Sequence, residues 1–196
     1  MLQIQGQTLI QRVVEAALAS ELDRIVLVLG NQHETITRHL GQKYDPQRGQ
    51  RIDPLRFSIV INRQYREGLS RSLCLGLDQV KDTHASVMFL LADQPLLDSS
   101  AINALLTAFA GSTKDICVPI HGKQSGNPTI LSRRFYQTMM KMKGDAGARQ
   151  IIRSSPSCVH FFHTKNPAYF FDIDTESDLS TWQTMIDPRR HVKKRL

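Results

Sequence analysis

The most restrictive feature of the sequence is a run of five large apolar residues at positions 87–91, which leads through Ala92 to a single carboxylate at Asp93. An unbroken apolar run of this length predicts a strand that is buried on both faces, as in a parallel sheet. Pro95 cannot continue a hydrogen-bond ladder, so we expect the strand to end close to Asp93. In open α/β sheets ligands bind beyond the carboxyl ends of the strands, where a carboxylate can hold Mg²⁺ against substrate phosphates. Asp93 is therefore either a metal ligand or a polar residue that opens a turn.

The composition is typical of a globular protein rather than a disordered or membrane-spanning one. The chain has 196 residues, of which 41% are hydrophobic and 22% charged, enough for one well-buried core. No apolar run approaches the roughly 20 residues that cross a bilayer, and the first residues lack the pattern of a secretory signal. The three cysteines lie far apart and form no CxxC pair. This spacing predicts reduced thiols and a cytoplasmic location.

The net charge of +7 is concentrated at one end of the chain. Five basic residues lie after Asp187, and without them the net charge falls to +2. A basic run of this kind is typical of a solvated terminus. Such a tail could bind nucleic acid, but no aromatic-rich RNA motif or helix-turn-helix pattern accompanies it, so we do not favour a nucleic-acid partner. We expect one domain over residues 1–187, followed by a basic tail at 188–196.

Apolar periodicity and turn residues divide the chain into alternating strands and helices. In the first half we expect helices at 6–20, 32–40, 70–80 and 98–110 and strands at 23–30, 57–61 and 86–92, with a loop at 41–56. This alternation predicts a parallel, doubly wound sheet with right-handed crossovers. The second half is less regular, with expected strands at 116–120, 128–131, 158–162 and 169–171 and helices at 132–142, 146–153 and 175–186.

A second acidic site lies near the C-terminus, at Asp172 and Asp174. If the chain is extended here, the two carboxylates point to the same side, because side chains alternate along a strand. Such a pair is costly unless a cation or hydrogen-bond donors offset the repulsion. Together with Asp93 the pair could form a Mg²⁺ site that bridges phosphates. Alternatively, Asp174 or Thr175 only caps the following helix and Asp172 lies in a surface turn.

Five short motifs follow one another along the chain and are informative together. They are Asn62 with Tyr65, Glu67, Gly68, Leu69, Ser70 and Ser72; Ala92-Asp93-Gln94-Pro95; Gly126-Asn127-Pro128; Gly144-Asp145-Ala146-Gly147-Ala148-Arg149; and Asp172-Ile173-Asp174-Thr175 with Asp178. In order and spacing these motifs resemble the MobA-like NTP transferases, and most closely the molybdenum cofactor cytidylyltransferases. The resemblance extends over about residues 2–182, which is nearly the whole chain.

The resemblance implies both a fold and a reaction. The fold is a three-layer α/β, Rossmann-like domain with a mostly parallel sheet, of the nucleotide-diphospho-sugar transferase type. The reaction is a Mg²⁺-dependent transfer of a nucleotidyl group from an NTP, in the nearest branch CMP from CTP, to a molybdopterin-type cofactor, with release of pyrophosphate. A molybdoenzyme is then a possible partner. The sequence leaves open whether the nucleotide is CTP or GTP.

The resemblance also implies roles for individual residues. Asp93 is the principal Mg²⁺ ligand, with Asp172 and Asp174 as a second part of the metal site. The expected nucleotide-binding residues are Gly68, Ser70, Ser72 and Gln94, and the expected acceptor-binding residues are Asn127, Pro128, Asp145 and Arg149. Asn127 stands where many relatives have histidine, and the alternative for Arg149 is an ordinary arginine on a helix surface.

One part of the family pattern is absent from this sequence. Family members open with a strand and a glycine-rich loop of the type LAAGxSxRMGxxK, whose backbone N–H groups and basic residues cradle the triphosphate. Here the first residues match the segment just after that loop. The missing strand is central in the family's sheet, so we expect residues 25–29 and 87–91 to have unpaired backbone groups on facing edges, at about 1–3 kcal/mol for each buried group. We therefore expect either a truncated or misassigned start, or a catalytically impaired member that serves as a molybdenum cofactor binding or accessory protein.

Overall fold

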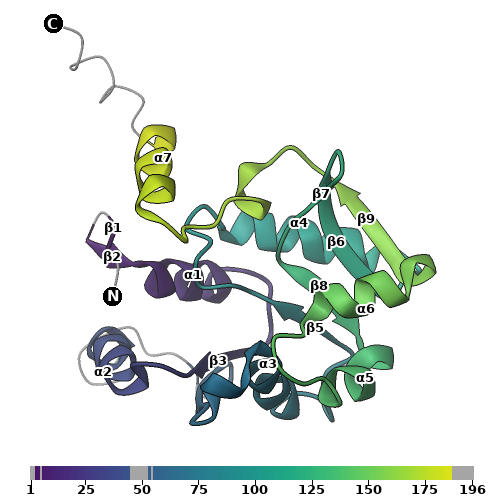
Figure 1. The fold of residues 1–196 in the computed structure, drawn as a ribbon, viewed down its shortest axis with the longest axis horizontal. Coiled ribbons are helices and arrows are strands. Elements are labelled where there is room, and N and C mark those ends of the chain that lie inside the picture. The colour runs from purple at the N-terminus through teal and green to yellow at the C-terminus, as the bar shows by residue number, and fades with distance from the viewer. Residues whose placement is uncertain (1–2, 5, 45–52, 54, 187–196) are drawn as a thin grey trace, which may run out of the picture.

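The structure is a computed structural model, and it describes residues 3–4, 6–44, 53 and 55–186 (Figure 1). The expected basic tail at 188–196 and most of the expected loop at 41–56 lie outside these residues. Within the described ranges no helix is long and apolar enough to cross a bilayer.

The larger strands form two sheets. β3 (Ile25–Leu29) pairs in parallel with β4 (Phe57–Ile61). A five-stranded sheet has the order β5–β8–β6–β7, and its fifth strand, β9, branches from this order by pairing with β6. Its strands are β5 (Ser86–Phe89), β6 (Ile116–His121), β7 (Gln124–Ser125), β8 (Thr129–Ser132) and β9 (Val159–His163). β8 is antiparallel to both β5 and β6, and β9 is parallel to β6, so β5, β6 and β9 run in one direction.

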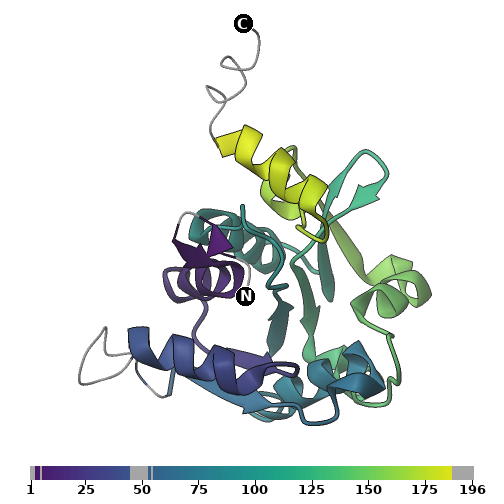
Figure 2. The same cartoon turned by 60° about the vertical axis from the view of Figure 1, so that its left-hand side comes forward.

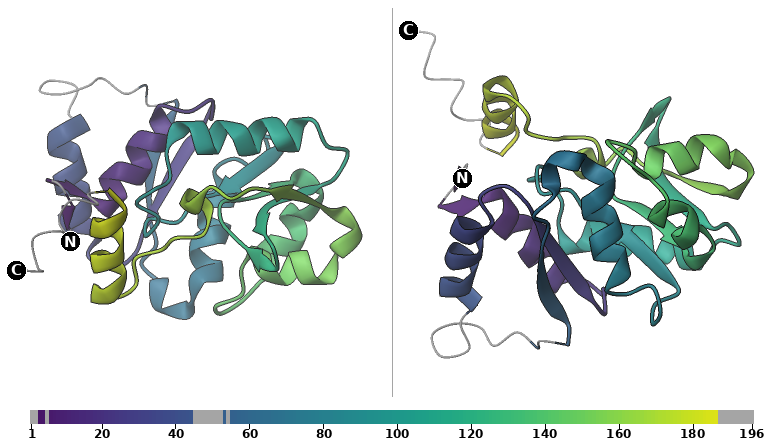
Figure 3. Two further views of the ribbon diagram at one scale, coloured as in Figure 1. Left: turned by 90° about the horizontal axis from the view of Figure 1, so that it is seen from above. Right: turned by 60° about the horizontal axis from the view of Figure 1, so that its bottom comes forward.

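Helices cover both faces of the strands, as Figures 2 and 3 show. Alternate side chains of β6 enter different cores: Cys117 packs with α1 and α4, whereas Ile116 and Val118 pack with α3, α5 and α6. Three layers of this kind confirm the α/β fold class that the sequence predicts. The helices are α1 (Leu9–Leu18), α2 (His33–Tyr44), α3 (Leu69–Asp78), α4 (Ser99–Ala110), α5 (Tyr136–Met140), α6 (Ala148–Ser154) and α7 (Glu176–Ile186). A short hairpin of β1 (Gln3–Ile4) and β2 (Gln7–Thr8) precedes α1.

Local side-chain chemistry explains where two of the helices begin. Thr8 and Gln11 form a capping box at the start of α1, in which each side chain bonds the backbone of the other residue. Asp98 caps α4, and its Oδ1 accepts a 2.8 Å hydrogen bond from the amide of Ala101.

The two sheets do not join into one. Among the described strands, β3 pairs only with β4 and β5 only with β8. A cavity of about 400 Å³ lies between the facing edges of β3 and β5 and is bounded by α1 and α3; we refer to it as the strand slot. The prediction that the 87–91 run is a strand buried on both faces is wrong in part. β5 ends at Phe89 and its residues are only half-buried, because no described strand covers the edge that faces β3.

The strand predicted at 169–171 is also wrong. Residues Pro167–Tyr169 form a turn of 3₁₀ helix, and the chain after Phe170 has no regular structure until α7. Asn166 favours this turn because its Oδ1 accepts a hydrogen bond from the amide of Ala168. The segment is apolar because it packs on the core beside α4, rather than because it belongs to a sheet.

Candidate functional site

The candidate site lies where the chain leaves β5 and where it enters α7. The amide of Ile173 donates a 2.9 Å hydrogen bond to the carbonyl oxygen of Asp93. This bond brings the flanking carboxylates, Asp172 and Asp174, close to Asp93, in the segment that follows β5. The structure thereby joins the two acidic segments that the sequence singled out, although they are far apart along the chain.

The environment of Asp93 is unfavourable to its charged form. Its Oδ1 is buried and has no hydrogen-bond partner among the described residues. Burial raises the pKa of this carboxyl above its ordinary value of 3.8, and a hydrogen bond from its own amide opposes the shift. The negative charges of Asp172 and Asp174 raise the pKa further. A buried carboxylate oxygen without a donor has the chemistry of a cation ligand.

Asp172 lies in a similar environment, but two neighbours oppose the rise of its pKa. Burial is the largest cause of its raised pKa, and the charges of Asp174 and Asp178 add to it. The Gln94 side chain and the Arg149 charge lower the pKa. The Gln94 amide is fully buried and lies close to Asp172, but no hydrogen bond of normal geometry joins them, so the contact is weak. Arg149 is therefore the cation of α6 that acts on this carboxylate.

Thr175 is the cap of α7. Its hydroxyl accepts a 3.2 Å hydrogen bond from the amide of Asp178, and its own amide donates to Asp178 Oδ2 at 2.8 Å. This reciprocal pair is a capping box, and it lowers the pKa of Asp178. Of the two caps that the sequence allows, Asp174 is thus not the one used. Its exposed carboxylate is not engaged in capping.

The donor set suits a hard divalent cation. Mg²⁺ and Mn²⁺ prefer carboxylate oxygens and usually share them with substrate phosphates. Asp93, Asp172 and Asp174 offer such oxygens, and one of them is buried without a partner. Within the described ranges, however, no three acidic, histidine or cysteine side chains are gathered closely enough to form a complete metal site. A cation at these carboxylates would therefore need further ligands, such as substrate phosphates.

The turn before α3 packs directly on the loop before α6. Gly68 has φ 109° and ψ 173°, a conformation that is essentially restricted to glycine. A Cβ at this position would lie 2.3 Å from the carbonyl carbon of Gly144. Ser70 donates its amide hydrogen to Gly144 O at 3.0 Å, and Leu69 donates to Asp145 Oδ1 at 3.3 Å. Asp145, predicted to bind the acceptor, thus has a structural bond to the first turn of α3.

The Gly126–Pro128 turn packs on the segment that leads to Asp172. The Asn127 amide donates a 2.8 Å hydrogen bond to Tyr169 O, and the bond between Asn127 and Pro128 is cis. A Cβ on Gly126 would lie 2.1 Å from the same carbonyl oxygen. Tyr169 is anchored in turn by its hydroxyl, which donates to Ala101 O at 2.7 Å, and burial raises its pKa to about 12.

The serines of α3 have structural partners of their own. Ser72 accepts a 2.9 Å hydrogen bond from Asn62 Nδ2 and lines the strand slot, and Ser70 is buried. No hydrogen bond or ion pair within the described residues joins Ser70, Ser72 or Asn127 to Asp93. The fully buried Asn62, to which the sequence assigned no role, fixes the turn after β4 through this bond. A polar residue directly after a strand is the signal that could have found it.

Arg12 was missed by the sequence reasoning. Its Nε donates to the carbonyl oxygen of Pro95 at 3.4 Å, and its guanidinium lies 5.7 Å from the ring centroid of Trp182. Arg12 thus connects α1 to the turn after β5 and to α7, the two elements that bring the carboxylates together. In the sequence it shows only as one polar position of an amphipathic helix.

Comparisons with known proteins agree with this architecture. The sequence matches the MobA-like NTP transferase domain over residues 1–159. It is 25% identical over 179 residues to the purine catabolism protein PucB of Bacillus subtilis strain 168, covering 90% of this chain and 83% of PucB. It is 23% identical over 182 residues to nicotine blue oxidoreductase of Paenarthrobacter nicotinovorans, covering 89% of this chain and 82% of that protein.

A solved structure shares the fold. The Rv0371c protein of Mycobacterium tuberculosis H37Rv, in complex with manganese, matches with a TM-score of 0.72 at 18% identity, covering 92% of this chain and 89% of that chain. The domain match covers most of the sequence. The chain therefore belongs to the MobA-like NTP transferase family and is a nucleotidyltransferase.

Proposed function

We propose that the protein transfers CMP from CTP to a molybdopterin-type cofactor, releases pyrophosphate and uses Mg²⁺. The acceptor's phosphate oxygen bonds to the α-phosphorus of CTP as the bond to the departing pyrophosphate breaks. The choice of CTP and of this acceptor rests on the resemblance of the five motifs to molybdenum cofactor cytidylyltransferases. A cytoplasmic location fits the three free cysteines.

The observation that carries the proposal is the meeting of Asp93 with the Asp172 and Asp174 pair at the end of β5. Mg²⁺ bound there would neutralise charge on the phosphates that develops during displacement. Asp93 would be the principal ligand because its Oδ1 is buried and without a donor. Asp172 would complete the protein side of the site, with Asp174 at its exposed rim.

Other residues would position the substrates. The charge of Arg149 lowers the pKa of Asp172, which supports a role in which its guanidinium would meet an anionic acceptor beside the proposed metal site. The Gly68 turn and the Gly126–Pro128 turn are packed on neighbouring backbone with no room for a Cβ at Gly68 or Gly126. We assign the Gly68 turn, with Ser70, Ser72 and Gln94, to the nucleotide, and Asn127, Pro128 and Asp145 to the acceptor side.

The strand slot favours a second function. Among the described strands, the edges of β3 and β5 that face each other are unpaired, whereas catalytic residues need rigid support. A catalytically impaired member that retains the cofactor, and passes it to a molybdoenzyme, would need the acceptor side of the site but no nucleotide. Measured turnover decides between these functions.

The deciding assay measures pyrophosphate release by the purified chain with Mg²⁺, molybdopterin-type cofactor and either CTP or GTP. The proposal predicts release that requires the cofactor and is faster with CTP, and that is lost in the Asp93→Asn variant. The exposed Asp82→Asn variant is the matched control, because it removes the same charge away from the site. Retention of the cofactor by the chain without any pyrophosphate release would instead support the accessory function.

A further inference from the structure

The segment that carries Asp172 and Asp174 is attached to the rest of the molecule through a small core of its own. Between the two carboxylates, the side chain of Ile173 is buried in a cluster whose other buried member is Trp182 of α7. Four partly buried apolar side chains pack against this pair: Leu9, Leu96, Phe171 and Leu179. We refer to these six residues as the α7 core. The two buried residues belong to neither of the larger cores beside the sheets, so the position of the carboxylates depends on how α7 is docked.

Trp182 is the anchor of α7. Figure 1 shows this helix at the periphery of the molecule, away from both sheets. The Trp182 side chain is buried, and it is the sole buried residue within the described side chains of α7. A buried indole ring is among the largest apolar contributions that a single side chain can make. The docking of α7 therefore depends mainly on this ring.

Arg12 of α1 contacts this ring and the turn after Asp93 at the same time. Its guanidinium lies 5.7 Å from the centroid of the Trp182 ring, which is within the range of a cation–π contact. Its Nε donates to Pro95 O at 3.4 Å, and Pro95 lies two residues after Asp93. This hydrogen bond is long, so the ring and the carbonyl oxygen together fix the direction of the guanidinium.

The two contacts use different parts of one planar group. A guanidinium can lie over an aromatic ring and donate hydrogen bonds in fixed directions, whereas a lysine ammonium is a point charge on a flexible stem. Leu9 lies one turn before Arg12 on the same face of α1, and it packs in the α7 core as well. The helix α1 therefore presents an apolar and a cationic contact to α7, and the cationic contact also reaches the chain that leaves β5.

We propose that Arg12 is a positioning residue of the metal site. By holding Trp182 against the turn at Pro95, it keeps the acidic segment before α7 next to Asp93. Repulsion among the carboxylates opposes this arrangement, so the contact matters most when no cation is bound. Arg12 acts through these neighbours and not by binding the cation itself. This inference rests on the proposed Mg²⁺ site.

Docking of α7 and binding of the cation are then linked. If Arg12 strengthens cation binding by holding α7 in place, a bound cation strengthens the docking of α7 by the same factor. Trp182 reports this docking directly, because it is the chain's sole tryptophan and lies in the α7 core. Quenching of its fluorescence by acrylamide measures how far the ring is exposed.

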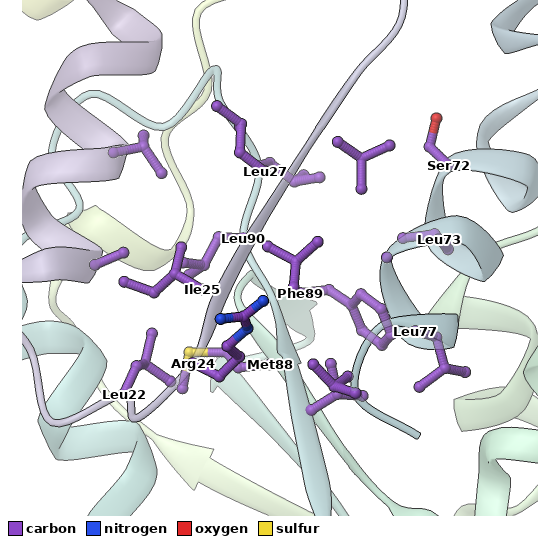
Figure 4. Close-up of a pocket in the computed structure, with 18 of the residues that line it drawn as sticks. Leu22, Arg24, Ile25, Leu27, Ser72, Leu73, Leu77, Met88, Phe89 and Leu90 are labelled. Atoms are coloured by element: carbon purple, nitrogen blue, oxygen red, sulfur yellow. The ribbon is translucent and has the colours of Figure 1, made fainter. Parts of the chain in front are cut away.

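The test uses the full 196-residue chain with two substitutions of Arg12. Arg12→Ala removes both contacts, whereas Arg12→Lys keeps the charge but not the planar group. The first control is Arg38→Ala, which removes an exposed arginine from α2. The second control is Val14→Ala, which removes buried methyl groups from α1 and so lowers stability. Val14 lies on another face of α1 from Arg12, where it lines the strand slot that Figure 4 shows.

Two measurements are compared across these variants. The first is Mn²⁺ affinity in the presence of CTP, which should fall about tenfold or more in both Arg12 variants, because residues that support metal ligands typically have effects of this size. The second is acrylamide quenching of Trp182 fluorescence. Quenching should increase in Arg12→Ala and return toward the wild-type value when saturating Mg²⁺ and CTP are added. Both control variants should match the wild type in both measurements.

Three results would overturn the proposal. Wild-type Mn²⁺ affinity in both Arg12 variants would show that the contacts do not support the site. Wild-type affinity in Arg12→Lys alone would show that charge and not position is what matters. An equal loss of affinity in Val14→Ala would show that general destabilisation explains the effect. Failure of the proposed metal site would look different, because the wild type and Asp93→Asn would then bind Mn²⁺ equally, and that result would overturn this inference too.

Discussion

Ile173 and Asp93 are joined backbone to backbone, with the amide of Ile173 donating to Asp93 O at 2.9 Å. The bond holds the irregular segment before α7 against the end of β5. Since Asp172 and Asp174 flank Ile173, it also holds three carboxylates near one another, although burial and mutual repulsion disfavour their charged forms. A site that is unfavourable for carboxylates without a cation is well suited to binding one.

The first prediction concerns pH. The pKa values of Asp93 and Asp172 are raised in the folded state above the ordinary value of 3.8, so the folded chain binds more protons than the unfolded chain. Their contribution is therefore fully stabilising below pH 3.8 and is lost as the pH rises through the folded pKa values. The Asp172→Asn variant should be more stable than the wild type at pH 7, with a difference that disappears in acid. Urea unfolding across this range measures the difference.

Asp178→Asn is the control of opposite sign. The pKa of Asp178 is lowered by its bonds to Thr175, so its contribution is present above the unfolded pKa and is lost as the pH falls through the folded value. This variant should be less stable than the wild type at pH 7. If both variants shifted stability in the same direction, the electrostatic description of the site would be wrong.

The second prediction concerns Gly68. Alanine there must adopt φ 109° and place its Cβ within 2.3–2.7 Å of the Gly144 backbone. We expect Gly68→Ala to lower the free energy of unfolding by about 3 kcal/mol or more, because strain and overpacking act together. Gly144→Ala is the matched control, since Gly144 has φ 65° but open space around its Cβ position, and should cost only about 1 kcal/mol. If chemical denaturation gave the same loss of unfolding free energy for both variants, the close contact between Gly68 and the Gly144 backbone would not be important for stability.

The third prediction separates substrate binding from helix stability. Removing the guanidinium in Arg149→Ala should raise the KM for the molybdopterin-type acceptor about tenfold or more and leave the KM for CTP nearly unchanged. Arg153→Ala, one turn further along α6, should leave both constants unchanged. Steady-state kinetics with each substrate varied in turn measures both. A similar rise in both KM values for Arg149→Ala would place this residue outside the acceptor site.

Sequence patterns predicted the local parts of the fold well. The strand β4 at 57–61 and the helix predicted at 98–110 follow from apolar periodicity, which depends on neighbours in the chain. The strand predicted at 169–171 failed because the apolar residues around Tyr169 pack on α4, and composition does not distinguish that packing from a sheet. The half-burial of β5 also could not be predicted from local composition, because it depends on which elements lie beside the strand.

The candidate site was predicted in part. The meeting of Asp93 with Asp172 depends on a long-range contact. The family resemblance, through the order of the motifs, implied this contact, whereas residue spacing alone did not predict it. Arg12 was missed because its contacts, with Pro95 and Trp182, come from distant parts of the chain. The roles assigned to Ser70, Ser72 and Asn127 remain predictions.

The most direct test of the central claim is manganese binding, followed by electron paramagnetic resonance of free Mn²⁺ in the presence of CTP. If Asp93, Asp172 and Asp174 hold a divalent cation jointly with nucleotide phosphates, the wild-type chain should bind Mn²⁺, and Asp93→Asn should weaken that binding about 100-fold or more. The Asp82→Asn control should bind like the wild type. Equal Mn²⁺ affinity in the wild type and in Asp93→Asn would contradict the assignment of a metal site to the end of β5.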